Sequence, residues 1–183
     1  MPAPSATPEQ DLRYPIGRAD AKSPLTPGER AQRIDAIAAA PAQLRQAVAG
    51  LSDAQLDTPY RPGGWTIRQL VHHVADSHIN AFTRFRLGLT EDNPTIKPYD
   101  EKAWAELPDM RHMPVDVSLR LLDALHERLV HLLRATPDSA FARQVRHPDN
   151  GPMTIDALVS TYSWHGQHHT AHVTSLRERE GWR

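Results

Sequence analysis

Apolar side chains recur at helical spacing over most of the chain and predict four principal helices. The predicted ranges are about 27–48, 66–89, 116–135 and 154–179. Within each range the apolar residues fall three or four positions apart, which places them on one face of a helix. The pattern therefore favours an all-α fold, a four-helix bundle in which these faces pack together.

Local signals mark where two of the helical segments begin. Thr26 precedes Pro27, and Glu29 completes a capping box with Thr26, so we expect the first helix to start here. Ser52 and Gln55 form a second such box and predict one short turn of helix. Pro41 lacks a backbone N–H, and we expect it to kink or break the first helix before a continuation to residue 48.

The inward faces of the three later helices are predicted from their apolar spacing. The second helix has Ile67, Leu70, Val71, Val74, His78, Ala81, Phe82, Phe85 and Leu89 in one stripe. The third is expected to bury Val117, Leu121, Leu125, Leu129 and Leu132. The last presents Ile155, Leu158, Val159, Tyr162, Val173 and Leu176.

The segments between and before the helices differ in character. Residues 1–25 hold five of the 16 prolines and are predicted to form an extended arm ahead of a single domain at 26–183. Residues 90–115 form a long crossover connection with one short helix expected, a length that suggests a lid or binding surface. Residues 141–148 look extended and lead into a turn at 149–151.

Composition excludes several classes of function. Lys and Arg number 21 against 22 Asp and Glu, so no basic surface for nucleic acid is indicated. The chain has no cysteine, which excludes disulfides, thiolate metal sites and a thiol nucleophile. No apolar run is long enough to cross a bilayer and no signal peptide is evident, so we expect a cytoplasmic protein with no membrane association.

Histidine is unusually abundant, and seven of the 11 histidines fall in two clusters within predicted helices. The first cluster is His72, His73 and His78, and the second is His165, His168, His169 and His172. His165 and His169 lie one turn apart and continue the buried stripe of the last helix. His168 is expected at the edge of this stripe or outside it. His112, His126, His131 and His147 are expected to be ordinary surface or loop residues.

Two imidazoles one turn apart on an inward face can converge on one metal ion. The first cluster is the expected source of a third ligand, and periodicity favours His78 for burial, with His73 second. The alternative is a set of neutral histidines whose nitrogens are satisfied by hydrogen bonds in a polar core. The spacing alone leaves both interpretations open.

Three segments resemble the DinB-like/YfiT family in order and spacing. They are YRPGGWTIRQLVHHVADSHINAFTRFRLGL, PYDEKAWAEL and TYSWHGQHHTAHV, and the resemblance extends over about residues 27–178. It implies a four-helix bundle, a homodimer and a metal triad. The family's ligands are a histidine eight residues after the tryptophan and the two histidines of the last helix, which here are His73, His165 and His169.

The resemblance implies a metal-dependent hydrolase with one zinc or nickel ion per chain, acting on a small-molecule substrate. Related proteins are S-transferases that use a low-molecular-weight thiol such as bacillithiol, so thiol transfer is the first alternative. A non-catalytic, metal-stabilised bundle that binds a ligand is the second. No motif places a general base beside the ion, and the candidates are His172, Asp76, Asp100 and Glu101.

Overall fold

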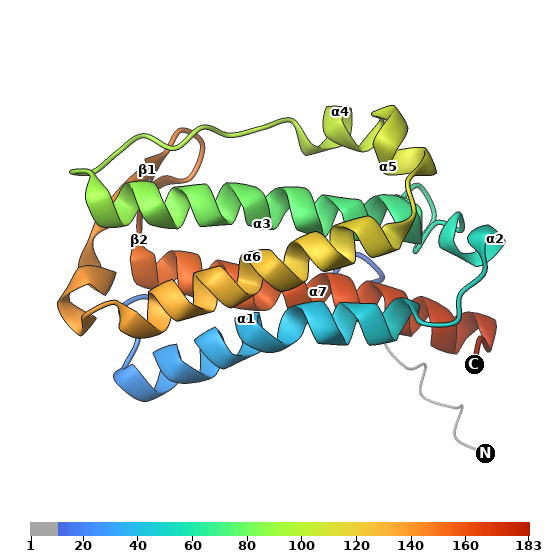
Figure 1. Ribbon diagram of the computed structural model, residues 1–183, viewed down its shortest axis with the longest axis horizontal. Coiled ribbons are helices and arrows are strands. Elements are labelled where there is room, and N and C mark those ends of the chain that lie inside the picture. Colours follow the sequence, from blue (N-terminus) through green and yellow to red (C-terminus); the bar gives the residue numbers. More distant parts are fainter. Residues whose placement is uncertain (1–10) are drawn as a thin grey trace, which may run out of the picture.

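Four long helices form the body of the protein, as predicted. The computed structural model describes residues 11–183, and its long helices are α1 (Pro27–Val48), α3 (Ile67–Thr90), α6 (Val115–Ala135) and α7 (Ile155–Glu180). In Figure 1, α1 and α7 run in one direction and α3 and α6 in the other. The chain between α3 and α6 must therefore return along the whole bundle, which makes it the expected crossover.

Short elements occupy the connections. They are α2 (Asp53–Leu56), α4 (Glu101–Ala105), α5 (Pro108–His112), a 3-10 helix η1 (Asp138–Ala142), and the strands β1 (Gln144–His147) and β2 (Gly151–Thr154). The strands pair antiparallel around the predicted turn, and residues 141 and 142 belong to η1, not to the strand.

The crossover contains two short helices instead of the one we expected. The Asp100 side chain accepts hydrogen bonds from the backbone N–H groups of Lys102 and Ala103 and so caps α4. Pro108 occupies the first turn of α5, where its missing N–H costs nothing. Both short helices lie over α3 at the end where that helix begins (Figure 1).

Capping boxes fix the starts of α1, α2 and α3. The predicted boxes of Thr26 with Glu29 and Ser52 with Gln55 are both present. A third joins Thr66 to Gln69 at the start of α3. Each box satisfies backbone N–H groups that no helical carbonyl can reach, so the sequence itself sets these starting points.

The predicted break at Pro41 is wrong, because α1 continues through it to Val48. Proline removes only one helical hydrogen bond, the one that its N–H would have donated to the carbonyl of Ile37. That carbonyl instead accepts a hydrogen bond from Nδ1 of His126, at 2.6 Å. Tertiary packing thus compensates for the lost bond.

The predicted inward face of α6 is also partly wrong. Val117 and Leu121 are 38% and 42% exposed. The buried face consists of Leu119, Leu122, His126, Leu129, Val130 and Leu133. His126, expected at the surface, is only 2% exposed and lies at the middle of this face. A prediction from apolar residues alone does not count His126 as buried. It therefore selects the neighbouring face of α6, whose apolar residues also have helical spacing.

The core consists of two groups of apolar residues along the bundle. Phe85 and Leu129 belong to one group, and Leu70 and Leu122 belong to the other. Along α6 the buried His126 falls between the leucines at 122 and 129, so it lies at the boundary between the two groups. The apolar core is therefore interrupted by a polar layer.

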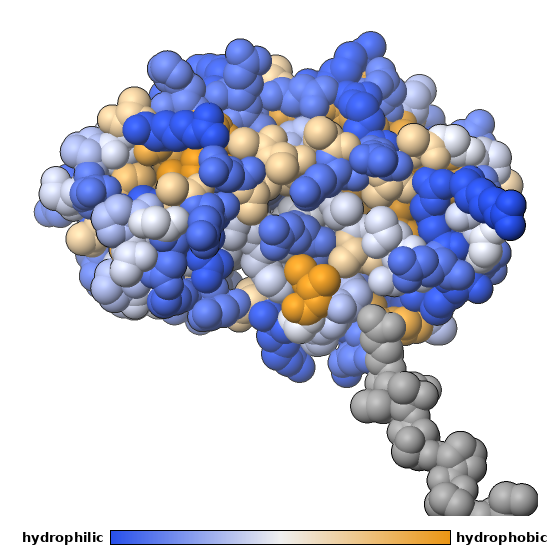
Figure 2. Space-filling view, turned by 90° about the horizontal axis from the view of Figure 1, so that it is seen from below, coloured by the Kyte–Doolittle hydropathy of each residue, from blue (hydrophilic) through white to orange (hydrophobic). Residues whose placement is uncertain are grey.

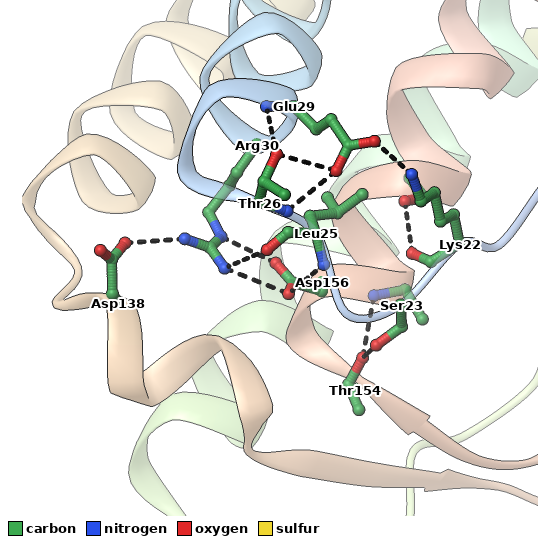
Figure 3. A network of polar contacts seen from close by, with 11 residues as sticks. Lys22, Ser23, Leu25, Thr26, Glu29, Arg30, Asp138, Thr154 and Asp156 are labelled. Atoms are coloured by element: carbon green, nitrogen blue, oxygen red, sulfur yellow. Dashed lines mark hydrogen bonds and ion pairs between the residues drawn. The ribbon is translucent and has the colours of Figure 1, made fainter.

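The described part of the N-terminal segment, residues 11–25, lies against α7. Asp156 of α7 accepts hydrogen bonds from the Leu25 backbone and from the Arg30 guanidinium, which also pairs with Asp138 (Figure 3). Further along α7, Trp164 donates its indole N–H to the carbonyl of Gly17 at 3.3 Å. The segment is thus held at its base by a buried ion pair and follows the helix that carries the second histidine cluster.

The face seen in Figure 2 carries mainly hydrophilic side chains, with strongly hydrophobic residues gathered in small separate patches. Within residues 11–183, no helix is long and apolar enough to span a membrane.

Candidate metal centre

Three histidines from two helices meet at one point inside the bundle. His73 comes from α3, and His165 and His169 come from consecutive turns of α7. One potential ligand nitrogen from each lies within 4.8 Å of the other two. These are the residues that the family resemblance selected, and His78, which periodicity favoured, is not one of them.

Burial keeps the three imidazoles neutral. It lowers the pKa of His73 to about 4. The pKa values of His165 and His169 are lowered well below 6.5, first by burial and then by the neighbouring histidines. A neutral imidazole has one nitrogen lone pair, which is what a metal ligand requires. The three rings are therefore in the binding-competent protonation state at neutral pH.

The hydrogen bonding of the cluster leaves nitrogens available. His165 uses Nδ1 in a hydrogen bond with Nε2 of His78, at 3.2 Å, and its Nε2 makes no hydrogen bond to another described residue. The buried Nδ1 of His169 likewise has none there. Unpartnered buried nitrogens are costly unless a ligand or ion occupies the site. This donor set fits a divalent transition-metal ion such as zinc or nickel.

The cluster opens into a cavity of about 840 Å³. Trp65 forms part of its wall, with its ring 4.5 Å from that of His73 between centroids. The remaining lining comes from the N-terminal segment, the loop before α3, the first turn of α3, the crossover and α7: Arg13, Tyr14, Tyr60, Arg61, Gly63, Gly64, Gln69, Glu101, Lys102, Glu106, Arg111, Trp164, His168 and His172. A small molecule entering this space would reach the three histidines directly.

Of the four candidate bases, His172 and Glu101 line the cavity. The Nε2 of His172 lies 3.2 Å from the Arg13 carbonyl, which can only accept a hydrogen bond. The proton therefore lies on Nε2, and the buried Nδ1 has a lone pair without a partner among the described residues. Burial lowers the pKa of this ring to about 4, so the ring is neutral at pH 7.

The acidic candidates are placed less favourably. Burial raises the pKa of Asp76 to about 6, with a contribution from Asp109, but Asp76 does not line the cavity. Asp100 is engaged in capping α4, and Glu101 lines the cavity from the first turn of that helix.

The other clustered histidines have separate surroundings. His72 is buried between Ser118 and the carbonyl of Met113, at 2.7 and 3.1 Å. His168, expected on the flank or outside, is buried and stacks on Trp164 with ring centroids 4.1 Å apart. Helical spacing could not indicate this burial, because the covering residues come from the N-terminal segment, where Tyr14 lies 6.0 Å from the same ring.

Comparison with known proteins finds a matching family and similar relatives. The family model described as the DinB superfamily matches residues 36–173. A protein of Bacillus cereus (strain ZK) named "Putative metal-dependent hydrolase" is 53% identical over 172 residues, covering 94% of this chain and 99% of the relative. A Bacillus anthracis protein of the same name (strain A0248) is 52% identical with the same coverage.

A solved structure is similar over the same extent. YfiT from Bacillus subtilis, described as a probable metal-dependent hydrolase with an unusual four-helix bundle topology, superposes with a TM-score of 0.92 at 47% sequence identity. The match covers 94% of this chain and 99% of that one.

Proposed function

We propose a hydrolytic function for this chain, which belongs to the DinB superfamily. In this proposal His73, His165 and His169 hold one divalent metal ion per chain, zinc or nickel, and the cavity beside it admits a small-molecule substrate. The observation that carries the proposal is the convergence of three neutral imidazoles, within 4.8 Å, at the wall of an open cavity. The names of the relatives agree with it.

The three ligands leave coordination positions open, which is typical of a catalytic site and not of a structural one. A divalent ion there supplies Lewis acidity, which polarises a carbonyl or acidifies water near neutral pH. The protein contributes a wall at Trp65 and the neutral imidazole of His172 in the lining of the cavity. We assign His172, not Asp76, the role of accepting a proton or hydrogen bond from the attacking water.

Metal analysis of the purified protein, followed by assays of the metal-loaded protein on ester and amide substrates, tests this function. We expect one ion per chain and turnover that His73→Ala abolishes. His131→Ala, which removes an exposed histidine of α6, should leave both unchanged.

Two other experimental results would indicate a different function. Consumption of bacillithiol with monochlorobimane, without hydrolysis in the absence of thiol, would identify a thiol S-transferase. A metal-dependent rise in melting temperature without either activity would identify a non-catalytic ligand-binding bundle.

A further inference from the structure

A continuous row of hydrogen bonds crosses the core and ends at one of the three clustered histidines. Nδ1 of His126 lies 2.6 Å from the Ile37 carbonyl, and its Nε2 lies 2.9 Å from Nδ1 of His78. The Nε2 of His78 lies 3.2 Å from Nδ1 of His165. These residues come from α1, α6, α3 and α7 in turn, so the row links all four long helices.

The carbonyl at one end sets the direction of every bond in the row. A carbonyl oxygen only accepts, so His126 must donate from Nδ1. A neutral imidazole carries one proton, and Nε2 of His126 is therefore an acceptor for Nδ1–H of His78. By the same step His78 accepts at Nε2 from Nδ1–H of His165. The lone pair of His165 is then on Nε2, the nitrogen left without a partner in the row.

The reverse direction is unfavourable. It would place the Nδ1 lone pair of His126 against the Ile37 oxygen at 2.6 Å. Two acceptors would then face each other in a buried position, where His126 is 2% exposed and water cannot relieve the contact.

Pro41 leaves the carbonyl of Ile37 without its regular partner within α1. In a regular helix the N–H of residue 41 would bond to the oxygen of Ile37, but proline has none. The oxygen is therefore free to accept from outside α1. Pro41 thus leaves this oxygen without its helical hydrogen bond, and His126 donates to it instead.

We propose that His126 and His78 are positioning residues that hold His165 with its proton on Nδ1 and its Nε2 lone pair toward the metal. The inference rests on the metal-binding role proposed above. Ligating histidines commonly donate their other N–H to a partner that fixes ring and tautomer, and loss of that partner typically weakens metal binding about 10- to 100-fold. Here that partner is another histidine, His78, whose own orientation is set through His126 by the Ile37 carbonyl.

Nitrogen-15 NMR of the histidine rings in the metal-free protein tests the direction without any metal. We expect His165, His78 and His126 all to carry the proton on Nδ1. A proton on Nε2 of His165 would overturn the proposal.

Metal titration by calorimetry tests the consequence. His126→Leu removes both hydrogen bonds with a side chain of similar size, and we expect about 10-fold weaker binding of zinc. His126→Gln can donate and accept through its amide and should restore most of the affinity. Ser118→Ala, on the same helix, removes a hydrogen bond to the buried His72 but lies outside the row, so it should bind zinc normally.

Pro41→Ala is a control on the first helix. It returns a helical N–H to the Ile37 oxygen, which has two lone pairs and can still accept from His126, so we expect the unfolding stability and the zinc affinity both to be maintained. Wild-type affinity in folded His126→Leu would overturn the proposal. Failure of the wild-type protein to bind any metal would instead overturn the proposed function, while the NMR result would still decide the direction of the row.

Discussion

Two groups of buried histidines differ in how their nitrogens are satisfied. In the core, His78 and His126 have a partner at both nitrogens. On the cavity side of α7, His168, His169 and His172 each have a buried Nδ1 with no partner among the described residues. All five side chains are buried, so burial alone does not distinguish the two groups.

The difference indicates two uses of the same side chain. A fully partnered imidazole stabilises one arrangement of the helices and has nothing left to offer a ligand. An imidazole with an unpartnered nitrogen carries a desolvation cost that an ion or substrate can remove. The predictions below test whether this division holds, beginning with the largest expected effect.

Removal of a cavity-side ligand should abolish metal binding. For His169→Ala we expect zinc affinity to fall by more than about 100-fold, beyond the loss typical of an outer partner. Calorimetry with the metal-free protein measures it. Nearly normal affinity would show that His169 does not hold the ion and would remove it from the cavity-side group.

Substitution in the core group should reduce stability even without metal. His78→Leu leaves Nε2 of His126 and Nδ1 of His165 unpartnered, and each buried orphan costs about 1–3 kcal/mol. We expect the free energy of unfolding of the metal-free protein to fall by about 3 kcal/mol in urea titrations. An unchanged midpoint would mean that the core hydrogen bonds contribute little.

Acidification should destabilise the metal-free protein because the histidines of both groups, and also His73, are buried as neutral rings. The pKa of His73 is about 4 in the folded state against 6.5 ordinarily, so the unfolded chain takes up protons first as the pH falls below 6.5. Stability is therefore lost from pH 6.5 down to about 4, by about 1.4 kcal/mol per pH unit for each such histidine. Urea titrations at pH 7, 6 and 5 measure the slope.

An exposed histidine provides the control for that experiment. His131→Leu should leave the slope unchanged, since this side chain is exposed and belongs to neither buried group. Equal stability of the unsubstituted protein at pH 7 and pH 5 would contradict the burial argument.

The smallest effect is expected for His168→Leu, which matches the substitution at His78. It removes an unpartnered nitrogen and loses the stacking on Trp164, and these two changes oppose each other. We expect the unfolding free energy to change by less than about 1 kcal/mol. A loss as large as that for His78→Leu would show that the two groups are not energetically distinct.

The sequence predicted the helices and their caps because those signals are local. Thr26 and Ser52 each mark a start that the structure contains. The crossover was harder, since α4 and α5 are too short to have a period and depend on one cap or one proline each.

The histidines were predicted unevenly. Spacing identified the pair on α7, but the choice of His73 over His78 depended on the family resemblance. His78 is the more central residue of the α3 stripe and was correctly expected to be buried, yet its neighbour His126 uses one of its nitrogens. Which buried ring faces a cavity depends on what the other helices place opposite it, and an apolar pattern within one helix contains no such information.

The capping box at Thr66 has a consequence for how this protein tolerates changes in length. Thr66 fixes where α3 begins, and His73 follows seven residues later, about two helical turns away. One residue inserted between them would rotate His73 by about 100° around the helix axis and away from α7. The same insertion at the exposed residues 91–93 would only lengthen a connection. Insertions and deletions should therefore be far less tolerated in this short stretch than substitutions at its exposed positions.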